Sequence, residues 1–243
     1  MDVYRTARPR AWLLCVAVAC IGVLVTGCGH GDATAPAGAG PTIGPVPAGP
    51  SAAEVFTACS PPGIVDYDPI ESLAVLAGDS TVVIAGEIDR IQAGRDTTHS
   101  APNETSMTGS AVIVVRNVTV VYGELEPAVN GSVYIEFASS SPDECAGTVP
   151  PGTAIVAYLE PAWDGARSYV DEYLDPTSVY TEIEDPGAGR PAGQPLYQAS
   201  ALEGLVWQIP GSADVVWPLY LGTGPGSIRE ALPDGTLAGP ERT

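Results

Sequence analysis

The chain has 243 residues, of which 45% are hydrophobic and 16% charged, and its formal net charge at pH 7 is −19. Its ten basic residues are all arginines, so the sequence offers no lysine for a Schiff base or a phosphate-binding loop. The acidic balance argues against binding of nucleic acid or anionic lipid, since both need a basic surface. It favours a solvated acidic surface or a cationic partner.

The first 27 residues have the pattern of a signal peptide. Three arginines precede an apolar run from residue 11 to residue 25, which is shorter than the roughly 20 residues that a membrane span needs. The run ends in Val25-Thr26-Gly27-Cys28, which resembles the lipobox of bacterial lipoproteins. The resemblance implies that Cys28 becomes the mature N-terminus and carries the lipid anchor. An ordinary signal peptide or an uncleaved anchor is the alternative.

Residues 28–53 form the next predicted segment. They are almost wholly Gly, Ala, Pro, Thr and Ser and have no apolar periodicity. We expect a lipidated cysteine followed by a tether that holds the domain away from the membrane. The remaining residues, 54–243, are enough for a single domain with a substantial core.

The five cysteines become an even number after processing. Cys15 and Cys20 would leave with the signal peptide, and Cys28 would be consumed by lipid. Cys59 and Cys145 then remain in a compartment where disulfides persist, so we predict a bond between them. Two buried free thiols or one reactive thiol are the alternative.

Short alternating runs separated by Gly, Pro, Asp and Asn predict a mainly β domain. A short helix is expected at 70–77, and strands are expected at 80–92, 110–123, 131–138 and 152–161. The polar segment 93–109 is predicted to be a long loop between two antiparallel strands. Segment 167–174 is ambiguous.

Three further strands are expected near the C-terminus, at 195–200, 203–209 and 214–220. A brief helix over 226–235, with Ser227 as its N-cap, closes the predicted fold. The expected fold class is therefore a small antiparallel β-barrel or sandwich with short helices and extra C-terminal strands.

The middle region, residues 74–159, resembles the OB-like barrel of netrin-like modules and of the tissue inhibitors of metalloproteinases. The resemblance rests on the order of "VVIAGEI", "VIVVRNVTVVYGE", "GSVYIEFAS" and "PPGTAIVAYL", with a cysteine before the last piece. It implies a five-stranded barrel core at about 74–159, clamped by a disulfide, with residues 160–243 added as further strands. The inhibitors bind protease zinc through an N-terminal cysteine. Cys59 lies inside the mature chain, so that mode does not carry over.

The sequence lacks the residues for most catalytic sites. His99 is the only histidine outside the tether, and its predicted loop position favours a solvated side chain over a Ser-His-Asp triad. Zinc sites need three or four Cys or His ligands, so we expect no metal and no cofactor. The segment 222–226, "GTGPG", fails the spacing of a nucleotide-binding fingerprint.

Two groups of side chains remain as candidates for function. Two acidic clusters could supply calcium ligands or the carboxylate pair of a glycosidase. They are Asp66, Asp68 and Glu71, and Asp171, Glu172 and Asp175; neither cluster has the spacing of an EF-hand. Aromatic residues gather in the C-terminal part and suggest a binding surface, although they also suit an ordinary core: Trp163, Tyr169, Tyr173, Tyr180, Trp207, Trp217 and Tyr220.

The function expected from the sequence is that of a lipid-anchored extracytoplasmic binding or scaffolding protein of the bacterial envelope, without catalytic residues. Its partners would be the membrane, through the lipid on Cys28, and an envelope protein or glycan. The alternative is an envelope hydrolase that uses carboxylates or His99. A substrate-binding lipoprotein for import is disfavoured, because strongly periodic helices are absent.

Overall fold

The computed structural model describes residues 49–61, 63, 67–101, 104–127, 131–163, 167–170 and 178–237. The predicted signal peptide, Cys28 and most of the predicted tether lie outside these residues. Within the described part of the chain, no helix is both long enough and apolar enough to span a membrane.

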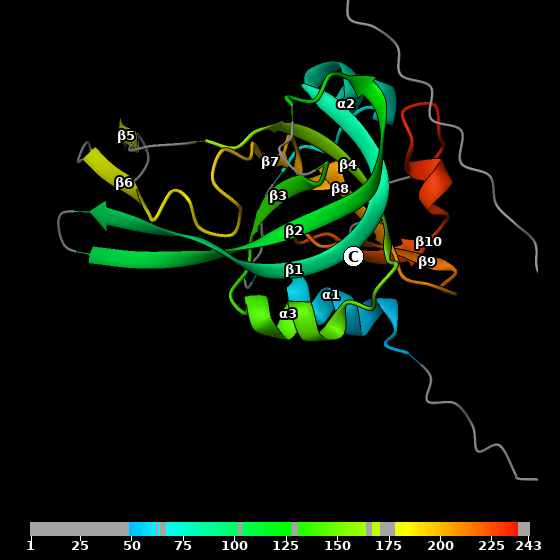
Figure 1. Ribbon diagram of the computed structural model, residues 1–243, viewed down its shortest axis with the longest axis horizontal. Coiled ribbons are helices and arrows are strands. Elements are labelled where there is room, and N and C mark those ends of the chain that lie inside the picture. Colours follow the sequence, from blue (N-terminus) through cyan, green and yellow to red (C-terminus); the bar gives the residue numbers. More distant parts are fainter. Residues whose placement is uncertain are drawn as a thin grey trace, which may run out of the picture. The chain divides into compact units, whose positions relative to one another are not determined.

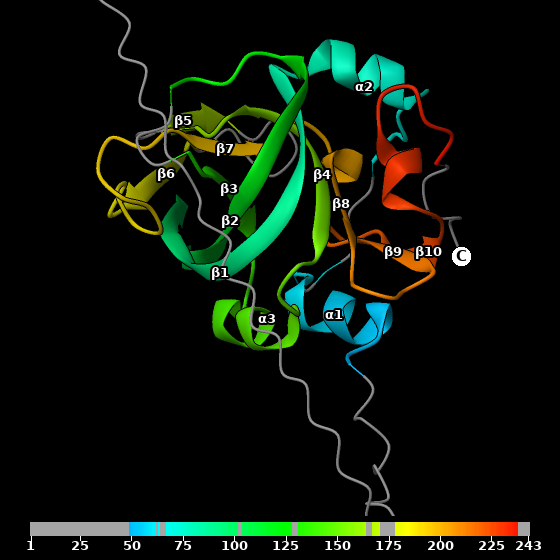
Figure 2. The same ribbon diagram turned by 45° about the vertical axis from the view of Figure 1, so that its right-hand side comes forward.

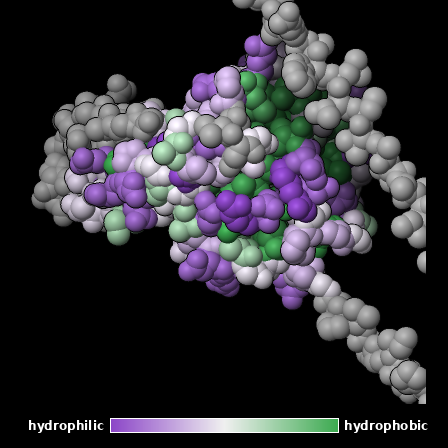
Figure 3. Space-filling view, viewed as in Figure 1, coloured by the Kyte–Doolittle hydropathy of each residue, from purple (hydrophilic) through white to green (hydrophobic). Residues whose placement is uncertain are grey.

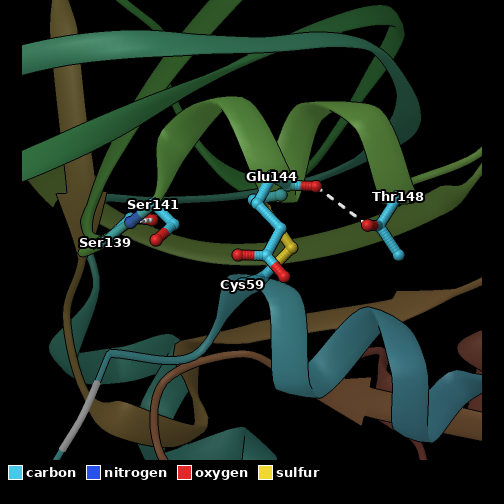
Figure 4. Close-up of a disulfide and its surroundings, with 6 residues drawn as sticks. Cys59, Ser139, Ser141, Glu144 and Thr148 are labelled. Carbon is cyan, nitrogen blue, oxygen red and sulfur yellow. Dashed lines mark hydrogen bonds between the residues drawn. A yellow bond between two sulfur atoms is a disulfide. The ribbon is translucent and has the colours of Figure 1, made fainter.

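The described fold begins with helix α1, Ala52–Cys59, and a disulfide joins it to helix α3, Pro142–Thr148. Ser51 and Glu54 form a capping box at the start of α1, so regular structure begins slightly before the expected domain start at residue 54. The predicted bond between Cys59 and Cys145 is confirmed, and both residues are fully buried. Figure 4 shows the bond crossing between the facing helices.

Two other helical segments were expected, and both are present. Helix α2, Leu73–Asp79, is capped by Ser72, and its first residue lies three residues beyond the predicted start at residue 70. The 3₁₀ helix η2, Ile228–Ala231, has the predicted N-cap, since the Ser227 hydroxyl accepts from a backbone N–H and its capping box is complete. A shorter 3₁₀ helix, η1, spans Leu202–Gly204.

The strand pairings close into a ring (Figures 1 and 2). The chain forms β1 (Val82–Ala101), β2 (Glu104–Gly123), β3 (Val133–Ala138), β4 (Ala154–Pro161) and β7 (Leu196–Ala199). Their order around the ring is β1–β2–β3–β7–β4, and β4 pairs again with β1. Only the β3–β7 pair in this ring is parallel. The ring therefore takes one strand from the C-terminal part, so the predicted barrel core at 74–159 is incomplete without β7.

Five further strands extend the same sheet on both sides of the ring. On one side β8 (Leu205–Gln208), β9 (Asp214–Trp217) and β10 (Gly222–Pro225) follow from β4. On the other side β6 (Ser178–Glu184) pairs with β1, and β5 (Arg167–Val170) pairs with β6. The mainly β class and the three predicted C-terminal strands are confirmed, whereas β6 and β10 were not expected.

The segment predicted as a loop, 93–109, is the outer half of a long hairpin, and the loop prediction is wrong. Strands β1 and β2 keep antiparallel register from Asp96↔Gly109 out to Ala101↔Glu104, and β6 pairs with the other edge of β1. In Figure 1 this part projects from the ring together with β5 and β6; we call it the arm. Its side chains are mostly accessible on both faces, so no hydrophobic alternation marks the strands, and backbone pairing alone defines them.

The core divides between the two faces of β1. Val82 and Ile84 pack inside the ring, whereas Val83 between them packs outside, against α2 and the C-terminal strands. This is the period-two alternation of a strand buried on both faces. The inner cluster also contains both disulfide cysteines, so α1 and α3 close one end of the ring.

Figure 3 shows hydrophilic residues over the arm and hydrophobic residues near α2. Among the described residues away from the arm, the exposed large apolar side chains are Val75 on α2 and Val120, Val121 and Tyr122 at the end of β2. At this end β2 extends beyond its pairing with β3, which stops at Val115.

Candidate functional site

A cavity of about 390 Å³ lies where the ring meets the arm, and we call it the junction cavity. Strands β1, β2, β3, β6 and β7 all contribute to its wall. Its volume falls within the usual range of ligand pockets, about 300–1,000 Å³. The cavity lies over the face of the sheet, because Ile183 of β6, Thr97 of β1 and Thr108 of β2 form a row across three paired strands.

A bulge in β1 marks the inner end of the cavity. Ala93 pairs with Ala111 and Asp96 pairs with Gly109, so two residues of β1, Gly94 and Arg95, lie opposite the single residue Ser110. Such bulges bend a strand and turn a side chain away from the regular alternation. A Cβ at residue 94 would collide with the Ser110 hydroxyl, which explains why glycine occupies this position.

The bulge places Arg95 against Glu136 of β3. Arg95 Nε donates to Glu136 Oε1 at 2.9 Å and to Oε2 at 3.1 Å, and Nη2 also donates to Oε2. The Ser110 hydroxyl lies 2.7 Å from Glu136 Oε1 and 2.9 Å from the Arg95 carbonyl oxygen, so it can donate to either. The two charged side chains are only 4% and 13% exposed. At that burial a charged pair is stable only with such bidentate geometry.

The rest of the lining combines polar and apolar side chains. The polar ones that lie beyond the ion pair and Ser110 are Thr97, His99, Thr108 and Gln198. The larger apolar ones are Phe137, Trp163, Ile183 and Leu219, and the smaller ones are Ala138 and Ala199. An apolar pocket with a few convergent polar groups is the usual form of a ligand-binding site.

His99 lies in this cavity and belongs to a strand, contrary to the predicted loop position. It pairs with Ser106 on β2 and with Thr181 on β6. Residues 95, 97 and 99 all line the cavity, as alternate residues of a strand do. His99 is four positions further along the strand than Arg95, a distance of about 13 Å. His99 therefore lies at the arm end, away from Glu136 and Ser110.

The predicted aromatic surface is not a single cluster. Trp163 lines the junction cavity, and Tyr220 is half-buried against the ring core. Trp207 and Trp217 are 0% and 3% exposed and belong to the core. Trp207 on β8 packs in the cluster inside the ring, and Trp217 on β9 packs in the cluster outside it. Tyr173 lies outside the described residues, as do the side chains of Tyr169 and Tyr180.

The acidic clusters do not form a described site. Asp68 and Glu71 are exposed, whereas Asp66, Asp171, Glu172 and Asp175 lie outside the described residues. Over the described part of the chain, no three His, Cys, Asp or Glu side chains come together to hold a metal.

Sequence reasoning missed Arg95, Ser110 and Glu136. One signal was available, since Glu136 is the single charge inside the otherwise apolar strand "VYIEFA". A charge in such a run is seldom buried without a partner. The partner could not be found from the sequence, because Arg95 lies 41 residues away in a segment that looked like a loop.

Comparisons with known proteins gave no relative: no family model matches the chain, and neither the curated proteins nor the solved structures gave a significant match.

Proposed function

We propose that this protein is a lipid-anchored binding protein of the bacterial envelope, and that its ligand occupies the junction cavity. The observation that carries the proposal is the cavity itself, which contains the ion pair between Arg95 and Glu136. It also has a polar rim and an apolar wall, formed respectively by Thr97, His99, Thr108 and Gln198 and by Phe137, Trp163, Ile183 and Leu219. The disulfide between Cys59 and Cys145 supports an extracytoplasmic location, because disulfides persist in oxidising compartments. The lipobox at Cys28 supports anchoring to the cell membrane.

We also propose that the ring is an OB-like barrel. Two features support this: β1, β2 and β3 pair in succession, and β4 returns to pair with β1, which is the Greek-key order. The OB-fold is a five-stranded Greek-key barrel that commonly binds ligands on its strand face and loops. A structure determined for residues 49–237 tests this assignment, which requires the parallel β3–β7 pair to be present.

The lipid anchor is tested by replacing Cys28 with alanine in cells fed an alkyne-labelled fatty acid. We expect the label to attach to the unaltered chain and to the Cys20→Ala control, and to be lost from Cys28→Ala. Label that persists on Cys28→Ala would show that the lipobox assignment is wrong.

The binding site is tested by native mass spectrometry of the full chain purified from bacterial membranes. Thr97→Trp fills the junction cavity, whereas Thr119→Trp adds the same side chain to an exposed site on β2 outside the cavity. We expect a co-purifying small molecule on the unaltered chain and on Thr119→Trp, and none on Thr97→Trp. A molecule retained by Thr97→Trp would place binding elsewhere.

The second candidate function is an envelope hydrolase, favoured by the presence of His99 and Glu136 in one cavity. Glu136 is already engaged by Arg95 and Ser110, which leaves it poorly suited to act as a base. The test is turnover of fluorogenic esters and glycosides by the full chain and by His99→Gln. Turnover that His99→Gln abolishes would favour the hydrolase over the binding protein.

A further inference from the structure

We propose that the ligand of the junction cavity is an uncharged sugar, bound with one ring face on the apolar wall. This inference rests on the proposed binding function and specifies its ligand class. It follows from three properties of the cavity: an ion pair whose charges neutralise each other, side chains that both donate and accept hydrogen bonds, and an aromatic side chain in the wall.

The charge argument disfavours ionic ligands. Arg95 and Glu136 neutralise each other through bidentate hydrogen bonds, and Ser110 lies within hydrogen-bond distance of Glu136. A ligand carboxylate could pair with Arg95, or a ligand ammonium with Glu136, only by breaking this buried pair and leaving one charge without its counterion. Anions are further disfavoured by the formal net charge of −19. The cavity therefore suits a neutral molecule.

The polar rim suits hydroxyl groups. Thr97 and Thr108 are directly opposite each other on β1 and β2, so their side chains are about 5 Å apart at Cβ. Gln198 donates its Nε2 to Glu160 Oε1 at 2.7 Å, and its own carbonyl oxygen can accept. Threonine hydroxyls both donate and accept, and sugar hydroxyls have the same dual capacity.

The apolar wall suits the C–H face of a sugar ring. Trp163 is half-buried and provides the accessible aromatic surface. Behind it the wall includes the core residue Phe137, only 4% exposed, which is held edge-to-face on the buried Trp207 with ring centroids 5.8 Å apart. Apolar side chains next to groups that bond hydroxyls fit a molecule with one C–H face and a hydroxylated edge. A purely apolar ligand would leave the rim groups without partners.

An extended peptide fits the site less well. Peptides that add to sheets use free strand edges, where backbone groups supply the hydrogen bonds. At Thr97 both edges of β1 are occupied, by Thr108 of β2 and by Ile183 of β6. The cavity therefore offers side chains on the face of a sheet and little backbone.

The test is isothermal titration of the full chain with N,N′-diacetylchitobiose, cellobiose and maltose as neutral probes, and with glucuronic acid and glucosamine as charged probes. We expect at least one neutral probe to bind at least tenfold more tightly than either charged probe. The double change Thr97→Val and Thr108→Val keeps the side-chain shape and should weaken binding at least tenfold, as should Trp163→Ala. Thr119→Val and Tyr122→Ala, both exposed and outside the cavity, are matched controls and should bind normally.

The result separates the ligand class from the binding function. Equal binding of charged probes, or full binding by the Thr97→Val and Thr108→Val chain, would overturn the sugar assignment. The sugar assignment would also be overturned if no neutral probe bound and mass spectrometry found a non-sugar molecule that Thr97→Trp excludes. In that case the proposed binding function of the cavity would still stand. If neither sugars nor any other molecule bind, both proposals fail.

Discussion

Removal of the disulfide between Cys59 and Cys145 should cost this fold a large part of its stability. The bond joins residues 86 apart in sequence. Helix α1 takes part in no strand pairing, so the disulfide is its cross-link to the rest of the fold. In the chain-entropy account, closing a loop of that length stabilises the folded state by about 4.6 kcal/mol at 25 °C. Many domains have a total stability of only about 5–15 kcal/mol. The chain with both cysteines replaced by alanine should therefore lose between about a third and nearly all of a stability in that range.

The assay is urea unfolding of the oxidised chain and of the Cys59→Ala and Cys145→Ala double variant, followed by tryptophan fluorescence. At about 2 kcal/mol per molar urea, the expected loss lowers the midpoint by about 2 M. Val55→Ala on the same helix is the control, since Val55 is fully buried and its truncation removes packing without removing a cross-link. It should cost about 2 kcal/mol. If the double variant lost no more than Val55→Ala, the cross-link would contribute little and the reasoning would be refuted.

Three further predictions concern single interactions. Breaking the buried pair with Glu136→Gln should cost about 3 kcal/mol in urea unfolding, and replacing both Arg95 and Glu136 by apolar residues should cost less than either single change. Burial raises the pKa of Tyr158, so the unfolded chain loses this proton first and stability should fall as the pH rises above about 10. Tyr158→Phe should flatten that alkaline decline in stability. It should also cost about 1 kcal/mol at neutral pH, because the hydrogen bond from the Tyr158 hydroxyl to the Ala231 carbonyl is lost. Thermal melting as a function of pH measures both effects, and an unchanged alkaline slope would show that Tyr158 does not cause the decline. Ser51→Ala should lower stability by about 1 kcal/mol through the lost cap of α1, and no change in the thermal midpoint would show that the cap is not needed.

The strands that bury one or both faces were predictable from the sequence. Runs such as 80–92 and 152–161 carry enough Val, Ile and Leu to mark them, and β1 and β4 lie at these positions. The pairing of the cysteines followed from counting them. The arm was not predictable, because its segment 93–109 is polar on both faces. One edge of its first strand also pairs with β6, which is about 80 residues further along the chain.

The candidate site was only partly predictable. Trp163 and His99 were named from the sequence, and both line the junction cavity. Trp207 and Trp217 belong to the core, since aromatic residues on strands point to either face and composition does not tell which. The bulge at Gly94 and Arg95 has no distinct sequence signal, because a glycine in a polar segment is typical of a loop as well.

By itself the sequence determined what depends on local pattern and on counting: the mainly β class, the short helix near 70–77, the helix capped by Ser227, the disulfide partners and the acidic, lysine-free composition. Only the tertiary structure decided the ring that β7 completes, the arm and the ion pair between Arg95 and Glu136. The physical reason is that these features depend on pairs of residues distant in sequence. These features are stabilised by backbone pairing and by charge neutralisation between strands, so the hydrophobic periodicity of a single segment does not predict them.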